Sequence, residues 1–221
     1  MNFLSRINRS RANIFVSGIN SPKISNAFES YLFNSNLNCP NLFIRRSTPT
    51  VVLGQNQNPW IECNLQQMKA DNVELTRRTT GGGAVYLDPG NMLVGFLGNI
   101  TNYPKLSKKD NNKIIIDSIS DVFDVKAVPS GRNDIVVGEK KVAGAAFKYN
   151  TVGNQEYTLH HMSILVNADL DALQKYLTPD KRKLESKGVK SVRSRVENLQ
   201  KRVSLDGTIE NFSSEAILSK I

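Results

Sequence analysis

The sequence has few cysteines and no long apolar run, and each absence restricts the kind of protein it can encode. Cys39 and Cys63 are the two cysteines among 221 residues, and they lack the spacing of metal ligands. Such a pair is most simply two reduced thiols, which favours an intracellular compartment. No run of about 18 apolar residues is present, which excludes a membrane-spanning helix. The length fits one large domain or two small ones, and a single core is the default expectation.

Acidic residues are missing from the first part of the chain. No Asp or Glu occurs between Met1 and Phe28, whereas Arg6, Arg9 and Arg11 lie among small polar and apolar residues. This composition is typical of a short organellar transit peptide, so residues 1–12 are interpreted as a leader, with a frayed tail as the alternative. A mitochondrion or a related organelle is therefore the expected location, with the cytoplasm as the alternative.

The charge of the whole chain is also one-sided. The formal net charge is +9. This balance predicts an acidic partner, such as nucleic acid, an anionic membrane or an acidic protein. A solvated basic surface is the other interpretation.

The order of expected elements indicates an α+β fold. Strands joined mainly by turns are typical of a mixed, largely antiparallel sheet packed with helices. The runs at 42–46 and 51–54 are interpreted as a hairpin. A helix starts at Ser21-Pro22, and a second at Asn58-Pro59, where Asn can cap and Pro suits the first turn. The first of these helices is expected to bury Ile24, Phe28, Tyr31 and Leu32. The other expected strands are 13–17, 73–77, 85–87, 92–97, 135–137, 141–148 and 158–166, and further helices surround 115–123 and 170–177.

A glycine-rich segment at 77–86 follows an expected strand. It reads Arg-Arg-Thr-Thr-Gly-Gly-Gly-Ala-Val-Tyr. Three glycines let a ligand approach the backbone, and exposed N–H groups in such a turn can bind an anion. Arg77 and Arg78 alternate along the strand, so one can face a pocket while the other faces solvent. The segment fits neither a phosphate-binding P-loop nor a dinucleotide fingerprint. A glycine-rich β-turn with surface arginines is the alternative.

A lysine on a later strand is the second candidate. Lys141 precedes Val142-Ala143-Gly144-Ala145-Ala146, whose small side chains leave room for a ligand, while Lys140 should point to the other face. Its ammonium could neutralise a carboxylate and an α-phosphate together, as attack of a carboxylate on phosphorus requires. Asp134 could orient Lys141 or hold a phosphate-bound metal, or it could be a turn carboxylate. A solvent-exposed lysine is the alternative for Lys141.

The two histidines, His160 and His161, are adjacent in an expected strand, so their rings should face opposite sides. Neither has a partner at metal-ligand spacing, and no zinc site is expected. Residues 179–194 are rich in Lys and Arg without periodicity, which indicates a mobile basic loop.

These segments together resemble the lipoate–protein ligase A family, within the biotin and lipoate ligase superfamily. The matching stretches are 54–60, 62–64, 77–91, 131–137, 141–148, 160–169 and 179–196, in family order. The resemblance implies a biotin/lipoate ligase-like catalytic domain over 13–221. It also implies a two-step reaction, in which lipoate and ATP give lipoyl-AMP and pyrophosphate, and the lipoyl group then passes to a lysine of a lipoyl domain.

The resemblance also implies roles for individual residues. Lys141 would contact both lipoate and phosphate as the catalytic residue, with Gly82 and His160 or His161 on the lipoyl side. Contacts to ATP or the adenylate would come from Arg78, Gly83, Ala84, Val85, Tyr86, Asn91 and Asp134. Lys181, Lys183, Arg193 and Arg195 would belong to an adenylate-binding loop over the intermediate.

The expected substrates are lipoate and ATP with Mg²⁺, with no tightly bound prosthetic group and no firmly assigned metal ligand. The expected partners are acidic lipoyl domains of 2-oxoacid dehydrogenase E2 subunits and the glycine cleavage H protein. Neither nucleic acid nor a membrane span is expected.

The sequence departs from the family pattern in two respects. Leu87 stands where family members often carry His, and the chain stops before the usual small C-terminal domain. A catalytic-domain-only form, a separate partner chain carrying that domain, and a fragment are the three interpretations. A transferase using preformed lipoyl-AMP or a protein-bound lipoyl or octanoyl donor is the alternative enzyme, and a basic nucleic-acid-binding domain is the alternative of another class.

Overall fold

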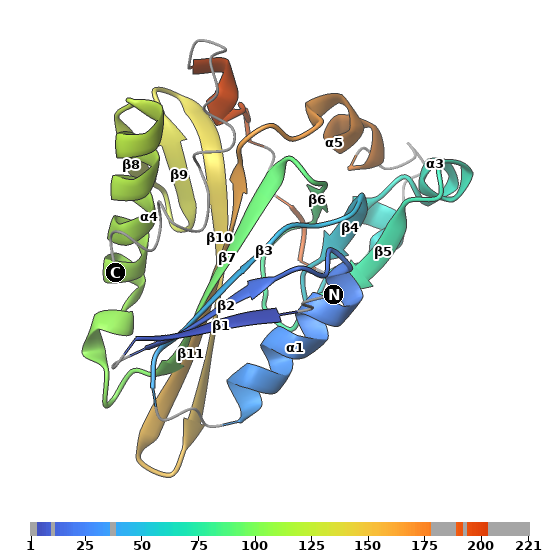
Figure 1. The fold of residues 1–221 in the computed structure, drawn as a ribbon. Coiled ribbons are helices and arrows are strands. Elements are labelled where there is room, and N and C mark those ends of the chain that lie inside the picture. Colours follow the sequence, from blue (N-terminus) through green and yellow to red (C-terminus); the bar gives the residue numbers. More distant parts are fainter. Residues whose placement is uncertain (1–3, 10–11, 36–38, 178–188, 192–193, 203–221) are drawn as a thin grey trace.

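The computed structural model describes residues 4–9, 12–35, 39–177, 189–191 and 194–202 (Figure 1). The strands are β1 (Leu4–Arg9), β2 (Ala12–Ser17), β3 (Asn41–Arg45), β4 (Thr50–Leu53), β5 (Glu74–Arg77), β6 (Val85–Leu87), β7 (Asn91–Asn99), β8 (Ala127–Ser130), β9 (Asp134–Val137), β10 (Lys140–Val152) and β11 (Gln155–Leu165). The helices are α1 (Pro22–Asn34), α2 (Pro59–Glu62), α3 (Leu65–Ala70), α4 (Lys108–Phe123) and α5 (Leu170–Tyr176), with 3₁₀ turns at Pro104–Leu106 and Leu199–Arg202.

Eight strands form one large sheet in the order β1-β2-β3-β7-β11-β10-β9-β8. Every neighbouring pair is antiparallel except β2 and β3, which are parallel. Parallel neighbours need a crossover, and α1 provides it between β2 and β3. The expected α+β fold with a mixed, largely antiparallel sheet is confirmed.

Two helices cover opposite faces of this sheet (Figure 1). Ile115, Ile119 and Phe123 follow helical spacing on α4 and pack in the same core as Leu42 and Ile44. On the other face, Leu32 and Phe33 of α1 pack against Phe43 and Leu97. Because alternate residues of a strand face opposite sides and both faces are covered, β3 is apolar at its three central positions and buried at all five.

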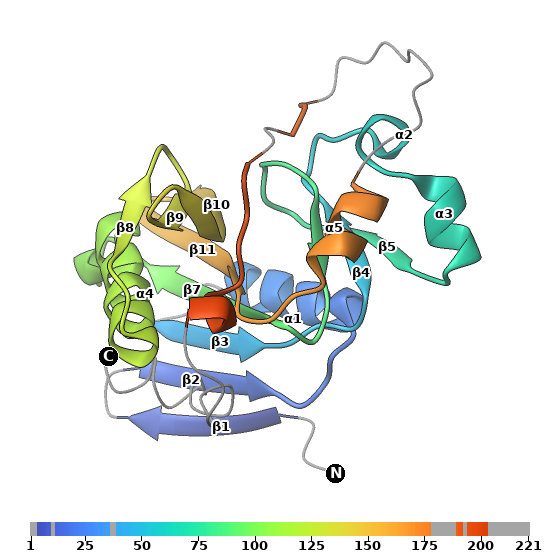
Figure 2. The same ribbon diagram turned by 90° about the horizontal axis from the view of Figure 1, so that it is seen from above.

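A second, three-stranded sheet has the order β5-β4-β6. It lies beside α2, α3 and α5, at a distance from α4 (Figure 2). Tyr86 and Tyr176 contact each other with ring centroids 5.4 Å apart, in a small core that also holds Val51, Leu53 and Met68. The glycine turn, residues 79–84, connects β5 to β6. None of the helices in the described part of the chain is long and apolar enough to cross a membrane.

The expected hairpin at 42–46 and 51–54 is wrong, because β3 joins the large sheet and β4 the small one. Both segments are apolar and bounded by turn residues, so local pattern alone could not identify their partners. The helix expected from Asn58 divides at Cys63, where Asn64 caps α3 by accepting a hydrogen bond from the Gln67 amide.

The predicted buried face of α1 is also partly wrong. Ile24 and Tyr31 are 54% and 67% exposed, whereas Ser25 and Glu29 are buried with Leu32 and Phe33. At the N-terminus the structure adds β1, paired with β2 along its whole length, inside the segment interpreted as a leader. The first strand therefore begins before residue 13.

Candidate functional site

A cavity of about 720 Å³ lies between the two sheets. The α1-side residues Arg45, Leu93, His161 and Ser163 of the large sheet form its floor, Lys108 and Phe147 line it from the side of α4, and one wall is the glycine turn with β6. Val189, Lys190 and Ser191 line it from another side. The glycine-rich segment, the segments at 131–137 and 141–148, and the described part of the basic loop therefore contribute to one site.

Strand register explains the length of the floor. Arg45 pairs with Leu93, Leu93 with Ser163, and Ser163 with Gly144, so these residues form one row across β3, β7, β11 and β10. Three spacings of about 4.8 Å between strands make the row roughly 14 Å long. Charged groups, Lys141 and Arg45, lie toward its ends. Leu93 lies between them and packs with Val52 and Leu87. The floor of the cavity is therefore a trough that is apolar in the middle and charged toward its ends.

Lys141 lies at one end of this trough. Its Nζ is 2.9 Å from Asp134 Oδ1, and the two side chains are 25% and 31% exposed. A Cβ on Gly144 would lie 2.8 Å from Lys141 Nζ, so glycine at this position makes room for the ammonium. Lys108 and Arg132 also line this end of the cavity. Lys141 lines the cavity and Lys140 does not, as the strand alternation predicted.

Arg78 has a different environment. It is 8% exposed, and its guanidinium donates to the carbonyls of Gly81 at 2.7 Å and Gly83 at 2.8 Å, and to Thr80 Oγ1 at 3.1 Å. Burial lowers the pKa of Arg78 to about 10, while Glu29 acts in the opposite direction. Arg78 lines the cavity, yet most of its donors already hold the glycine turn.

Arg77 holds a neighbouring loop. It is exposed, as one of the two arginines was expected to be, but its Nη1 donates to the carbonyls of Gly54, Gln55 and Gln57 at 2.9, 3.1 and 2.8 Å. The two adjacent arginines therefore clamp two different backbone segments.

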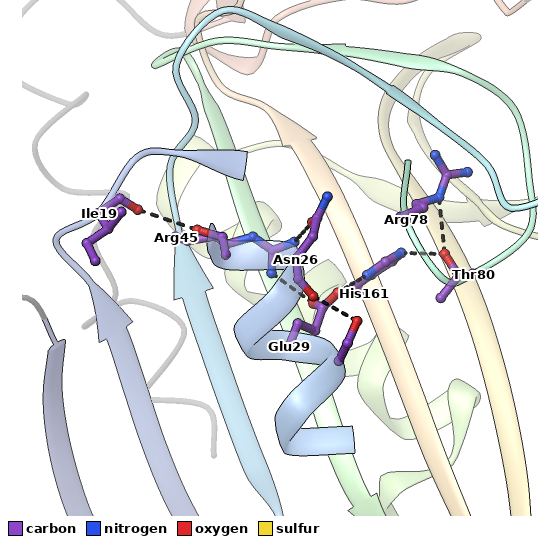
Figure 3. A network of polar contacts seen from close by, with 9 residues as sticks. Ile19, Asn26, Glu29, Arg45, Arg78, Thr80 and His161 are labelled. Carbon is purple, nitrogen blue, oxygen red and sulfur yellow. Dashed lines mark hydrogen bonds and ion pairs between the residues drawn. The ribbon is translucent and has the colours of Figure 1, made fainter. Parts of the chain in front are cut away.

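A buried chain of polar contacts joins the glycine turn to α1 (Figure 3). His161 Nε2 lies 2.9 Å from Thr80 Oγ1, and His161 Nδ1 lies 2.8 Å from Glu29 Oε2. Glu29 also pairs with Arg45 at 2.8 Å. Burial raises the pKa of the Glu29 carboxyl, but Arg45 and His161 lower it more, so the net pKa lies well below the ordinary value. Sequence patterns assigned no role to Glu29, Arg45 or Thr80, and a charge such as Glu29 on an amphipathic helix is normally assigned to solvent.

Three predicted contacts lie outside the cavity wall. His160 faces the other side of the sheet, fully buried and stacked on Phe147 at 3.9 Å, and burial lowers its pKa to about 3. Tyr86 points into the small core because Val85 and Leu87 take the cavity side of β6. Asn91 is buried, and its side chain accepts a hydrogen bond from the Asp88 amide in the turn before β7.

The remaining predicted residues divide into three groups. Gly82, Gly83, Ala84, Val85, Asp134 and His161 line the cavity, as does Leu87. Arg195 is exposed, and its carbonyl accepts a hydrogen bond from the Lys141 amide at 2.8 Å. Lys181, Lys183, Arg193 and most of the basic loop lie outside the described residues.

Two further predictions concern metals and thiols. Among the described residues, no group of three or more His, Cys, Asp or Glu side chains could hold a metal ion. Cys63 is buried, and burial, with a smaller effect of Glu62, raises the pKa of its thiol to about 12. The thiol is therefore protonated at neutral pH, as expected for a structural cysteine.

Comparison with known proteins identifies similar chains. The family model of the lipoyl protein ligase A/B catalytic domain matches residues 21–220. A lipoate-protein ligase A from Psychrobacter cryohalolentis is 42% identical over 187 residues, which are 84% of this chain and 53% of the relative. The chain thus spans about half the length of this curated relative.

Solved structures share the fold. Plasmodium falciparum LipL1 in complex with lipoate has a TM-score of 0.73 and 30% identity, over 95% of this chain and 57% of its own. The bipartite lipoate protein ligase of Thermoplasma acidophilum has a TM-score of 0.75 and 25% identity, over 97% and 82%. A lipoate-protein ligase A bound with ATP has a TM-score of 0.72 and 25% identity, over 96% and 82%.

Proposed function

This chain belongs to the lipoyl protein ligase A/B catalytic-domain family, and we propose that it is an ATP-dependent lipoate–protein ligase. The carboxylate of lipoate attacks the α-phosphorus of ATP, pyrophosphate leaves, and lipoyl-AMP forms. The ε-amine of a lysine on a lipoyl domain then attacks the acyl carbon and AMP leaves. The observation that carries this proposal is an apolar trough ending at Lys141 and Asp134, beside Lys108 and Arg132.

Lys141 is the proposed catalytic residue. Negative charge is shared between the incoming carboxylate and the α-phosphate as the new P–O bond forms. A half-buried ammonium between the two partners stabilises that charge without reorganising at the moment of reaction. Asp134 orients the ammonium, and Lys108 and Arg132 lie where the phosphate tail would extend.

The apolar trough is the proposed lipoyl site. Leu93, Val52 and Leu87 would contact the acyl chain, with His161 toward its Arg45 end. Leu87 thus supplies apolar surface in place of the histidine common in the family. Solved relatives carry lipoate or ATP, in P. falciparum LipL1 and in a lipoate-protein ligase A respectively.

Magnesium is proposed to enter with ATP. Asp134 is the single carboxylate among the described residues that line the cavity, and it already pairs with Lys141. Mg²⁺ in nucleotide sites is commonly held by one or two carboxylates together with phosphates and water. The ion would therefore be bound mainly by the nucleotide.

The proposed partners are acidic lipoyl domains, as in 2-oxoacid dehydrogenase E2 subunits and the glycine cleavage H protein. The net charge of +9 favours encounter with an acidic surface. The T. acidophilum relative was studied with its E2 lipoyl domain, and it is bipartite. A separate chain that assists activation is accordingly part of the proposal.

An organellar location is also proposed from the acid-free, arginine-containing first residues. Cleavage near residue 12 would remove β1, which pairs with β2. The N-terminal sequence of the protein isolated from its cell therefore checks this proposal, and an intact Met1 or Asn2 would contradict it.

One assay tests the function. The chain is incubated with lipoate, an apo lipoyl domain and either ATP or synthetic lipoyl-AMP, and the acceptor is weighed by mass spectrometry. A ligase lipoylates the acceptor in both arms. Lipoylation from lipoyl-AMP alone identifies either a transferase or a chain that needs the separate partner for activation, and an unmodified acceptor in both arms contradicts the proposal.

A further inference from the structure

The strap, residues 189–191, lies against the glycine turn and lines the cavity. Ser191 Oγ accepts a hydrogen bond from the Ala84 amide at 2.9 Å. A Cβ on Gly83 would lie 2.9 Å from Ser191 Oγ and 3.3 Å from Ser191 Cα. The strap and the turn are therefore in direct contact, and an anion reaching the turn would compete with Ser191 for the Ala84 hydrogen.

Two buried side chains outside the cavity wall hold this strap. Gln57 is 4% exposed, and its Nε2 donates to Ser191 Oγ at 3.0 Å while its Oε1 accepts from the Gly54 amide at 3.0 Å. Glu62 is 7% exposed, and both of its carboxylate oxygens lie within 3.2–3.3 Å of the Ser191 amide nitrogen. The Val189 amide also donates to the Asn56 carbonyl at 3.1 Å.

The segment that carries these anchors is itself fixed. Arg77 clamps the carbonyls of residues 54, 55 and 57. Gly54 lies against the turn so closely that a Cβ there would be 2.1 Å from the Gly82 carbonyl oxygen. Residues 54–57, the glycine turn and the strap therefore form three contacting backbone layers.

We propose that Gln57 and Glu62 are positioning residues that anchor the strap over bound lipoyl-adenylate and so set how long the intermediate stays in the cavity. This inference rests on the proposed ligase function. A mixed anhydride hydrolyses in water, so an intermediate held under an anchored strap reaches the acceptor instead of escaping.

The two anchors have opposite hydrogen-bonding needs, which makes the proposal specific. The Ser191 amide needs an acceptor, and both carboxylate and carboxamide oxygens provide one. Gln57 Nε2 donates to Ser191 Oγ and, at 3.4 Å, to the Val189 carbonyl. The hydroxyl could turn to donate to a carboxylate, but the carbonyl can only accept, so a carboxylate in place of the amide would repel it. Glu62→Gln should therefore preserve the strap, whereas Gln57→Glu should release it.

The test uses a non-hydrolysable lipoyl-sulfamoyl-adenosine and measures its dissociation by stopped-flow displacement. Glu62→Ala and Gln57→Glu should each speed dissociation about tenfold, the effect of losing about 1.4 kcal/mol, with association nearly unchanged. Glu62→Gln should stay within about twofold of wild type. Tyr176→Phe, which loses a 2.8 Å hydrogen bond to Asp71 in the same part of the molecule, is the control for general destabilisation and should dissociate at the wild-type rate.

A ligand-free measurement separates this inference from the ligase function. Hydrogen exchange at the Ser191 amide should be faster in Glu62→Ala than in wild type and unchanged in Glu62→Gln. If the wild type fails to bind the analogue, the ligase proposal fails, while the exchange result still decides whether Glu62 anchors the strap. Equal dissociation rates in wild type, Glu62→Ala and Gln57→Glu, or a Glu62→Gln variant as fast as Glu62→Ala, would overturn the inference.

Discussion

Arg78 and Lys141 are both cations in the cavity wall, yet their environments differ. Arg78 comes from the small sheet, and its donors are bound to the carbonyls of Gly81 and Gly83 and to Thr80. Lys141 comes from the large sheet, pairs with Asp134 and is 25% exposed. This difference supports the proposal that Arg78 shapes the site while Lys141 performs its chemistry. Substitutions at the two positions should therefore separate stability from activity.

The largest expected effect is on the rate after Lys141→Ala. Losing one fixed charge-stabilising donor typically lowers the rate about 10² to 10³-fold. A half-exposed ion pair contributes little to stability, so the free energy of unfolding should change by less than about 1 kcal/mol. Pyrophosphate release with ATP and lipoate, alongside urea unfolding, measures both quantities. Lys140→Ala is the matched control, and a drop of similar size in that variant would argue against a specific role for Lys141.

Arg78→Ala should show the opposite balance, with a large loss of stability. The carbonyls of Gly81 and Gly83 lose a charged donor, and hydrogen bonds to charged groups contribute about 1.5–3 kcal/mol each. We expect a loss of about 3 kcal/mol and a Tm roughly 10 °C lower. Arg78→Lys should recover little, because an ammonium cannot reproduce the guanidinium fork. An Arg78→Ala variant with the wild-type Tm would mean that the arginine does not support the turn.

Two glycines of the same turn should respond differently to alanine. A Cβ on Gly83 meets Ser191, whereas a Cβ on Gly81 meets nothing within 4 Å. Gly83→Ala should cost about 1–2 kcal/mol through overpacking, and Gly81→Ala should stay within about 0.5 kcal/mol of wild type. Denaturant unfolding of both variants checks this, and equal costs would show that the strap does not contact the turn in solution.

A further expected effect is a pH dependence due to His160. Its pKa is about 3 in the folded state and near 6.5 when unfolded. Between pH 3 and pH 6.5 the unfolded chain binds a proton at His160 that the folded chain does not bind. The contribution of His160 to the free energy of unfolding is therefore fully present above pH 6.5 and falls as the pH decreases. The slope is at most about 1.4 kcal/mol per pH unit.

Urea unfolding at pH 7, 6 and 5 should show this slope in the wild type and a flatter one in His160→Leu. Glu29 does not affect this pH range. The pKa of its carboxyl is lowered in the folded state, so its contribution to stability is lost only when the pH falls below the ordinary pKa of 4.5. Identical slopes in the two proteins would show that His160 is not buried in its neutral form.

Sequence patterns located the fold class, both key segments and the alternation of Lys140 and Lys141. These predictions rest on short-range periodicity and on residue chemistry, which the sequence displays directly. The pairing of β3 and β4 was wrong because partner strands are chosen by the whole sheet. Glu29 was missed because its burial depends on space above Gly95, where a Cβ would lie 2.9 Å from Glu29 Oε1, and on Arg45 from another strand. Likewise, the contacts of Arg78 could not be inferred without the path of the turn around it.

We propose that one cavity holds lipoate and nucleotide together at Lys141. Calorimetric titration with lipoyl-sulfamoyl-adenosine, lipoate and AMP tests it most directly. The joined analogue should bind at least about 100-fold more tightly than either half, and Lys141→Ala should remove most of this gain. An analogue that binds no better than AMP, or equally well to wild type and Lys141→Ala, would contradict it.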